Sequence, residues 1–206
     1  ENAVSDALDL DVSSATINNS RFINSGNDAV DLMTTQATIL NTLFAQNGDK
    51  GISVGEGSHL VGINNQISNN EIGVQSKDRS TALLFNHTFM DNQIALHAYR
   101  KNWRYGEGGT IFLSKSLIRK NNKPSSAEKQ SSLYLFDSAI EGELPSGKRV
   151  ELEAIENDNK VKATEGNYFP GGNKLNGEVQ RLLLQIPQEV AQQINSKTRG
   201  ANGGVD

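Results

Sequence analysis

The sequence contains no cysteine, which excludes disulfide bonds, thiolate metal sites and cysteine nucleophiles. It also has no apolar run approaching the roughly 18 residues of a membrane span, so we expect no insertion into a membrane. Neither charge is in strong excess, because 24 Asp and Glu stand against 20 Lys and Arg. Such a mixed, slightly acidic balance gives no reason to expect nucleic acid as a partner.

Motifs of several common enzyme classes are missing too. The sequence has no Gly-x-Gly-x-x-Gly after a strand, no Walker A motif, no His-Glu-x-x-His and no Gly-x-Ser-x-Gly. Its three histidines, His59, His87 and His97, fall at different places in an internal repeat. We therefore do not expect them to form a zinc site.

That internal repeat, of about 22 residues, is the dominant feature of the sequence. The phrase SDALDLDVSSATI at residues 5–17 returns as NDAVDLMTTQATI at residues 27–39. Aliphatic residues recur at this spacing at Leu8, Val30, Ile52, Val74 and Leu96, each preceded by a small residue at Ala7, Ala29, Gly51, Gly73 and Ala95. A second apolar column recurs with small slips at Ile17, Ile39, Ile63 and Phe85. Asparagines fall between the apolar groups at Asn19, Asn41, Asn64 and Asn86, and again at Asn47, Asn70 and Asn92.

This pattern predicts an all-β fold, a right-handed parallel β-helix. Each unit shows two or three short strand-like pieces separated by Asn, Gly or Ser corners. At about 3.3 Å per strand residue, about 22 residues make one triangular coil, and coils stack about 4.8 Å apart. Stacked asparagine side chains then form a hydrogen-bonded ladder. A leucine-rich repeat of similar length is disfavoured, because its Leu-x-x-Leu-x-Leu-x-x-Asn pattern and helical segment are missing.

We expect the β-helix to occupy residues 1–170, with irregular coils toward its end. The segment 121–132 is polar and is predicted to be a loop. Residues 171–206 are expected to form a capping segment, with a short helix at 187–197 and a flexible tail, because an open coil end is an unpaired sheet edge.

The repeat over residues 6–117, and more loosely to 169, resembles the pectin-lyase-like right-handed β-helix superfamily. The phrases GDKGISVGEG (48–57) and NDAVDL (27–32) are also similar to β-helix modules of large bacterial surface proteins, some of which carry a CotH-type kinase-like domain. This resemblance implies an extracellular or cell-surface location in bacteria, and other domains of a parent chain as partners. The fold serves lyases, hydrolases, epimerases and inert adhesin stalks, so it does not by itself specify an activity.

One outward face of the coils is the candidate functional surface. Alternation along residues 7–11 directs Leu8 and Leu10 inward and the small and acidic residues between them outward. Stacking then predicts an outward column at Asp9, Asp31, Ser53, Gln75 and His97, and a second at Asp11, Met33, Gly55, Lys77 and Tyr99. The column of small residues is expected to keep this face shallow. An insertion in the fifth coil is expected to add Arg100, Lys101, Trp103, Arg104 and Tyr105 at its rim.

A polysaccharide or cell-surface glycan is the ligand that this face favours. Aromatic rings stack on sugars, and carboxylates accept hydrogen bonds from sugar hydroxyls. The predicted ligand-binding residues are Asp9, Asp11, Asp31, Gln75, Lys77, His97, Tyr99, Arg100, Trp103 and Tyr105. The alternative is that these side chains are ordinary solvated surface and that the β-helix is a structural or adhesive spacer.

The stacked aspartates also suggest a cation site. Asp9 above Asp31, and Asp6 above Asp28, bring like charges close together, so they must share a proton, bind a cation or be separated by solvent. Oxygen-rich clusters of this kind hold Ca²⁺, which makes calcium the one cofactor we consider. The alternative for Asp6 and Asp28 is a hydrogen bond to the corner backbone, as in an Asx turn.

An enzyme is the third hypothesis, after the binding module and the spacer. The segment NDAVDL followed by GDKGISVG resembles polygalacturonase-type glycoside hydrolases, with Asp28 and Asp49 at family aspartate positions. Lys50 replaces the second aspartate of the family pair, and the family histidine has no counterpart. A lyase or epimerase would instead abstract a proton from a uronate with a basic side chain. The candidate catalytic residues are Asp9, Asp31, Lys77, His97 and Tyr99.

Overall fold

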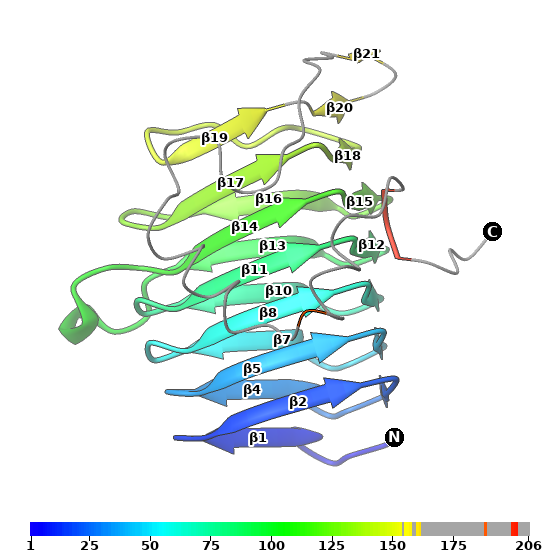
Figure 1. Cartoon of the computed structure of the whole chain (residues 1–206), viewed down its shortest axis with the longest axis vertical. Helices are drawn as coiled ribbons and strands as arrows, with labels where there is room; N and C mark the ends of the chain where they lie inside the picture. Colours follow the sequence, from blue (N-terminus) through cyan, green and yellow to red (C-terminus); the bar gives the residue numbers. More distant parts are fainter. Residues whose placement is uncertain (154, 158–159, 162–187, 189–198, 202–206) are drawn as a thin grey trace.

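The chain folds into a parallel β-solenoid of three sheets (Figure 1). The computed structural model describes residues 1–153, 155–157, 160–161, 188 and 199–201. Successive strands along the chain pass from sheet A to sheet B to sheet C, and each sheet is extended by one strand per coil. The predicted all-β solenoid of about 22 residues per coil is therefore confirmed.

Sheet A contains six strands in chain order in the described part of the chain: β1 (Leu8–Asp11), β4 (Val30–Met33), β7 (Lys50–Gly55), β10 (Ile72–Lys77), β13 (Ile94–Tyr99) and β16 (Lys123–Ala127). Sheet B contains β2 (Ser14–Asn18), β5 (Gln36–Leu40), β8 (His59–Ile63), β11 (Thr81–Phe85), β14 (Thr110–Ser114), β17 (Ser132–Phe136) and β19 (Val150–Glu153). Sheet C contains β3 (Arg21–Ile23), β6 (Leu43–Ala45), β9 (Gln66–Ser68), β12 (Thr88–Met90), β15 (Leu117–Arg119), β18 (Ala139–Ile140), β20 (Glu156–Asn157) and β21 (Lys160–Val161). Pairing is parallel except between β20 and β21.

The inward residues of the three sheets form one apolar column. Val30 pairs with Ile52 and Val74 with Leu96, and these side chains are fully buried. Each such side chain contributes about 1.5–3 kcal/mol when it is removed from water. A single coil has no second layer against which to bury them, so the repetition of the pattern is what stabilises the fold.

The small residues at the start of the sheet A strands lie inside the solenoid, and the prediction that they form a shallow outer face is wrong. Ala29 and Ala95 are fully buried in the core. A Cβ placed on Gly73 would lie 2.6 Å from the Ala95 carbonyl oxygen and 2.9 Å from the Phe89 ring. The small residues therefore leave room for the large side chains of sheet C where the chain bends into sheet A.

The second predicted apolar column is wrong by one residue from the third coil onward. Ile39 pairs with Gly62, whereas Ile63 pairs with Leu40. The corner at 56–58 is one residue longer than the corner at 34–35, which moves Ile63 to the other face of its strand. Ile63 and Phe85 thus belong to a second apolar cluster, separate from the core, together with Leu40, Val61, Leu83, Phe112 and Phe136.

At most corners between sheets, a residue with a positive φ is followed by a polar residue, which is usually buried. At the corner from sheet C to sheet A, these polar residues are Asn47, Asn70, Asn92 and Asn121, of which the first three are buried. Each amide nitrogen of these three donates to the next side-chain oxygen at 2.8–3.0 Å. At the corner from sheet B to sheet C, the positive-φ residues include Asn19, Asn41, Asn64 and Asn86. The predicted asparagine ladder is therefore confirmed.

The segment 121–132 is a strand rather than the predicted loop for part of its length. Residues 123–127 form β16, which pairs with β13 at the edge of sheet A. Its sequence, KPSSA, lacks the alternation of apolar and polar residues that predicts a strand. Pro124 is accommodated because an edge strand has one side without a partner.

Most of residues 171–206, including the helix predicted at 187–197, lies outside the described residues. Where the tail was predicted, Arg199 binds Asp137 and Glu156 at 3.0 and 2.6 Å, and the Ala201 amide donates to Thr88 Oγ1 at 3.0 Å. Within the described part of the chain, no helix is both long and apolar enough to cross a membrane.

Candidate functional site

The outer face of sheet A carries the predicted column of polar side chains. Strand register places Asp9 beside Asp31, Asp31 beside Ser53, Ser53 beside Gln75 and Gln75 beside His97. Ser126 continues the column in the sixth coil. These side chains therefore share one wall, and its chemistry changes from acidic in the first coils to neutral and aromatic in the fifth.

The aspartates at the start of the strands cap the corner backbone. The Asp28 amide donates to Asp6 Oδ1 at 2.9 Å, and the Lys50 amide donates to Asp28 Oδ1 at 3.1 Å. Lys50 Nζ adds a 3.2 Å ion pair with Asp28 and contacts Asp49 as well. Burial raises the pKa of Asp28, although Lys50 opposes this shift. Asp6 and Asp28 thus have the structural role that we considered as the alternative to cation binding.

Lys77 neutralises the middle of the face. It points back along the wall, donates to Ser53 Oγ at 3.1 Å and lies 3.9 Å from Asp31 Oδ1. Its side chain passes over Gly55, where a Cβ would lie 2.4 Å from the Lys77 Cε. Lys77 is only 6 % exposed, so it is engaged within the wall and is poorly placed as a base for an external substrate.

The first coil keeps its acidic character. Asp9 and Asp11 are exposed, and the pKa of Asp9 is raised by desolvation and by the neighbouring charges of Asp11, Asp31 and Asp6. Even so, no group of three or more His, Cys, Asp or Glu side chains is arranged to hold a metal ion within the described residues. The candidate calcium ligands Asp6, Asp9, Asp28 and Asp31 do not converge on such a group.

His97 lies at the centre of a hydrogen-bonded group in the fifth coil. Its Nε2 lies 3.3 Å from Glu128 Oε1, and its Nδ1 lies 3.1 Å from Gln75 Nε2. A carboxylate only accepts, so Nε2 carries the hydrogen and Nδ1 accepts from Gln75. Burial lowers the pKa of His97, while Glu128 opposes this shift, so the ring favours the neutral form.

Tyr99 stacks on His97, with ring centroids 4.9 Å apart. Burial raises the pKa of the Tyr99 hydroxyl above its ordinary value. The phenol is therefore protonated at neutral pH and can donate a hydrogen bond, but it is unsuited to act as a base. The two rings lie face to face, with 12° between their planes, beside the polar column.

The insertion of the fifth coil occupies residues 100–109, between β13 and β14, and contains the short helix η1 (Trp103–Tyr105). It projects sideways from the corner between sheets A and B (Figure 1), so it extends away from the outer face whose rim we expected it to form. Asp78 Oδ1 anchors its base by accepting from the Lys101 and Asn102 amides, both at 2.8 Å. Trp103, at the tip, is 75 % exposed.

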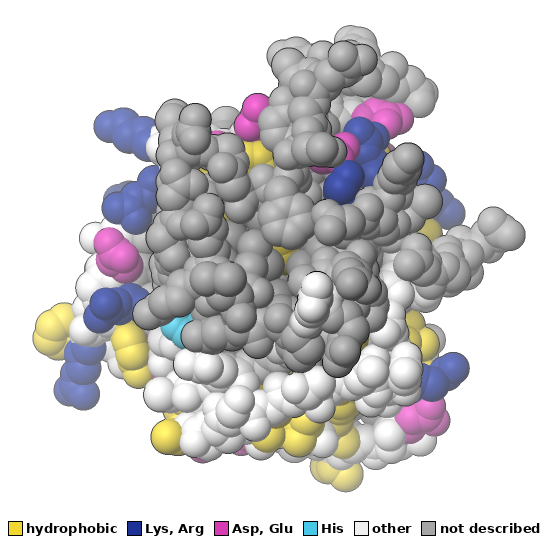
Figure 2. Space-filling view, viewed as in Figure 1, with side chains coloured by type: hydrophobic (Ala, Val, Ile, Leu, Met, Phe, Trp, Pro, Cys, Tyr) yellow, Lys and Arg dark blue, Asp and Glu magenta, His cyan; other side chains and the backbone are white. Residues whose placement is uncertain are grey.

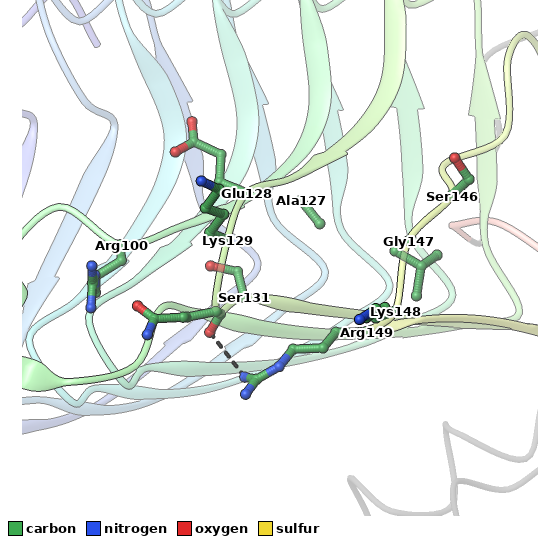
Figure 3. Close-up of a pocket in the computed structure, with 11 residues that line it drawn as sticks. Arg100, Ala127, Glu128, Lys129, Ser131, Ser146, Gly147, Lys148 and Arg149 are labelled. Atoms are coloured by element: carbon green, nitrogen blue, oxygen red, sulfur yellow. Dashed lines mark hydrogen bonds between the residues drawn. The ribbon is translucent and has the colours of Figure 1, made fainter.

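A pocket of about 510 Å³ lies at the same corner, one coil further along the solenoid. Figure 3 shows it between Arg100, the corner after β16 and the segment leading into β19. It is lined by Arg100, Ala127, Glu128, Lys129, Gln130, Ser131, Ser146, Gly147, Lys148, Arg149 and Val150. Glu128 joins it to His97, so the pocket continues the outer face of sheet A.

Sequence reasoning predicted only part of this arrangement. The structure brings Gln75 and Tyr99 together around His97 and places Arg100 in the pocket with Glu128, whereas Asp9, Asp11 and Asp31 lie at the other end of the wall. Trp103 and Tyr105 are carried on the projecting loop beyond the pocket. The residues that reasoning missed are Glu128, Lys129, Lys148 and Arg149, and the concentration of cations in residues 148–149 was the available signal.

The comparisons with known proteins agree with this architecture. Residues 1–141 match the family model described as the right-handed β-helix region. No curated protein and no solved structure gives a significant match. The family match carries no information about a CotH-type kinase-like domain. Because it spans more than half of the chain, the chain belongs to the right-handed β-helix family.

Proposed function

We propose that the chain is a carbohydrate-recognising β-helix module of a larger bacterial exported or cell-surface protein. The observation that carries this proposal is the continuity between the stacked His97 and Tyr99 rings and the adjoining pocket. Stacked rings next to a polar column suit a sugar ring, whose faces are apolar and whose edge carries hydroxyls. An extended glycan would lie from the pocket across these rings and onto the outer face of sheet A.

Binding is favoured over catalysis by the state of the candidate catalytic groups. Lys77 and Asp31 lie within one hydrogen-bonded and charged group with Ser53. The Tyr99 phenol is protonated, and the His97 Nδ1 already accepts from Gln75. A proton-abstracting base must reach its substrate proton with a free lone pair. Incubation with uronate polymers, followed at about 235 nm for the unsaturated lyase product, tests the enzymatic alternative.

The binding function is tested by affinity gel electrophoresis against a panel of neutral and acidic polysaccharides. Removal of an aromatic ring that stacks on a sugar reduces affinity by about fivefold, so Tyr99→Ala and Trp103→Ala are the informative variants. Asp31→Ala probes the acidic end of the wall. Arg119→Ala, on sheet C, is the matched control, because Arg119 is exposed and lies on a different sheet.

The outcomes separate the hypotheses. Retarded migration that is weakened by the aromatic variants and not by Arg119→Ala supports the module and its site. Retardation that none of these variants changes leaves the class intact and places the site elsewhere. Absence of retardation by every polysaccharide of the panel favours the structural or adhesive spacer.

A further inference from the structure

The pocket described above has a strong positive charge on a chain that is acidic overall. Arg100, Lys129, Lys148 and Arg149 line it, against one carboxylate, Glu128, among its described residues. Figure 3 shows the Glu128 carboxylate pointing away from the Arg149 guanidinium. Figure 2 shows Lys and Arg side chains on the left side of the molecule, the side from which the 100–109 loop projects in Figure 1, and further ones on its right side. The formal net charge of the whole chain is −4, so this concentration is local.

The four cations are not balanced by partners of their own within the described residues. The Arg149 guanidinium donates to the Gln130 carbonyl oxygen at 3.2 Å, and Arg100 donates to the Gly106 carbonyl oxygen at 3.2 Å. Both acceptors are neutral, and both contacts hold the guanidinium groups in place while leaving their charge uncompensated. The Glu128 carboxylate instead accepts a hydrogen bond from His97 Nε2.

The pocket lies where a ladder of hydroxyl groups stops. At the corner from sheet A to sheet B, each backbone amide donates to the hydroxyl of the next coil: Ser13 to Thr35 at 3.3 Å, Thr35 to Ser58 at 2.9 Å and Ser58 to Ser80 at 3.1 Å. The next position is Gly109, which has no side chain, and its amide donates to the Tyr99 carbonyl oxygen instead. The insertion has therefore interrupted the ladder.

Ser131 is the residue that this interruption leaves without a partner. It occupies the ladder position of the sixth coil, is 2 % exposed and lines the pocket. Its Oγ fills the space beside Gly108 and has no hydrogen-bond partner among the described residues. A buried hydroxyl without a partner is destabilising, so a ligand acceptor in this pocket would find a donor that has no competing partner among the described residues.

We propose that this corner pocket is a subsite for an oxyanion, a sulfate, phosphate or carboxylate group, carried by the ligand. This inference rests on the proposed function, because it assigns the glycan of that site to the acidic class. Arg149 and Arg100 supply planar guanidinium donors, which suit paired oxygens, and Lys129 and Lys148 add point charges. Ser131 adds the neutral donor.

Three polymers with one backbone provide the test: dextran, dextran sulfate and carboxymethyl dextran. Binding of each to the whole chain is measured by isothermal titration calorimetry at low and at high NaCl. We expect at least one anionic polymer to bind roughly tenfold or more tightly than dextran, since hydrogen bonds to charged groups are each worth about 1.5–3 kcal/mol. The preference should shrink at high salt. Comparison of the two anionic polymers shows which oxyanion is preferred.

Two double variants separate a built site from general charge attraction. Lys148→Ala/Arg149→Ala removes two pocket cations and should reduce the anionic polymers to the affinity of dextran. Arg119→Ala/Lys120→Ala removes the same charge from exposed positions near sheet C and should retain the preference. Circular dichroism of both variants checks that each remains folded.

The outcomes distinguish failure of the oxyanion subsite from failure of carbohydrate recognition. Equal binding of all three polymers overturns the oxyanion subsite and leaves carbohydrate recognition standing. Equal loss in the two double variants also overturns it, because general charge attraction then explains the binding. No binding of the anionic dextrans overturns the subsite alone if the polysaccharide panel yields a ligand, and overturns the proposed function with it if the panel yields none.

Discussion

Two corners of the solenoid satisfy the hydrogen bonds of their backbone amides with different side chains. At the corner from sheet C to sheet A, Asn47, Asn70, Asn92 and Asn121 repeat the same hydrogen-bonded side chain. At the corner from sheet A to sheet B, a hydroxyl ladder runs from Ser13 to Ser80 and then stops at Gly109. At the first corner the asparagine side chains bond one another from coil to coil in addition to the backbone. At the second, most rungs are a backbone amide that donates to a hydroxyl, and this is the corner that carries the insertion and the pocket.

The difference shows how a repetitive fold acquires a specific site. The connections from sheet A to sheet B occupy residues 12–13, 34–35, 56–58, 78–80, 100–109 and 128–131. These connections have two or three residues in the first four coils, ten in the fifth and four in the sixth. New contacts replace the interrupted ladder, chiefly those of Asp78 with the Lys101 and Asn102 amides. The strands on either side keep their register, so the insertion changes the surface and leaves the core unchanged.

Breaking the asparagine corner should have the largest effect on stability. Asn70 accepts from the Asn47 backbone and side-chain amides at 3.1 and 2.8 Å and donates to Asn92 Oδ1 at 3.0 Å. Asn70→Ala leaves all three buried groups without this partner. We expect the free energy of unfolding to fall by about 3–5 kcal/mol, measured by urea denaturation. Ser58→Ala, at the hydroxyl corner, should cost only about 1–2 kcal/mol, and equal costs would contradict the contrast between the corners.

Removal of the Asp78 anchor should have the next largest effect. Asp78 is fully buried, so Asp78→Ala leaves two backbone amides unpaired and lowers the free energy of unfolding by about 2–3 kcal/mol. Trp103 is the single tryptophan of the sequence and lies in the anchored loop, so its fluorescence anisotropy reports on the loop directly. We expect the anisotropy to decrease in Asp78→Ala. Asp78→Asn keeps an acceptor oxygen and should retain most of the anisotropy of the unsubstituted protein. Equal anisotropy in the unsubstituted protein and both variants would show that the loop is held by other contacts.

The contrast between the corners also explains what could be predicted from the sequence. The core column and the asparagine ladder were predictable because the same residue type returns at the same spacing, as at Val30 and Ile52. A change of one residue in corner length was enough to reverse the orientation predicted for Ile63. The order of the side chains from Asp9 to His97 on the outer face could be predicted from the same 22-residue spacing as the core.

The pocket could not be predicted in this way. Its cations come from an insertion, from the corner after β16 and from the irregular segment before β19, and none of these has a repeat position. Lys129 and Arg149 line the same pocket, Lys129 from the corner at 128–131 and Arg149 from the segment before β19. Contacts of this kind depend on loop conformation, which sequence periodicity does not encode.

Acidification should weaken the third corner, from sheet B to sheet C. His87 is fully buried there, with Nδ1 at 2.9 Å from the Phe85 carbonyl oxygen and Nε2 at 3.2 Å from Asn65 Nδ2, and burial lowers its pKa to about 4. The unfolded chain binds a proton below about pH 6.5, whereas the folded chain does not until about pH 4. The free energy of unfolding should therefore decrease by about 2 kcal/mol between pH 7 and pH 5.

The pH effect can be assigned to His87 by substitution. His87→Gln removes the titrating group and should flatten the decrease between pH 7 and pH 5, measured by urea denaturation at each pH. The lowered pKa of His97 acts in the same direction, so His97→Gln is the parallel variant. A decrease that persists unchanged in His87→Gln would assign the effect to other groups.

Truncation of Arg149 should have the smallest effect on stability. It therefore tests whether the pocket corner binds a ligand without contributing to the stability of the coil stack. Arg149 is exposed, and its hydrogen bond goes to the carbonyl of Gln130, another exposed residue. Arg149→Ala should change the free energy of unfolding by no more than about 0.5 kcal/mol in urea denaturation, while it weakens binding of the anionic dextrans. A loss above about 1 kcal/mol would mean that residues 146–149 help to hold the coil stack together. In that case the corner from sheet A to sheet B would contribute to stability as well as to binding, because Arg149 would contribute to both.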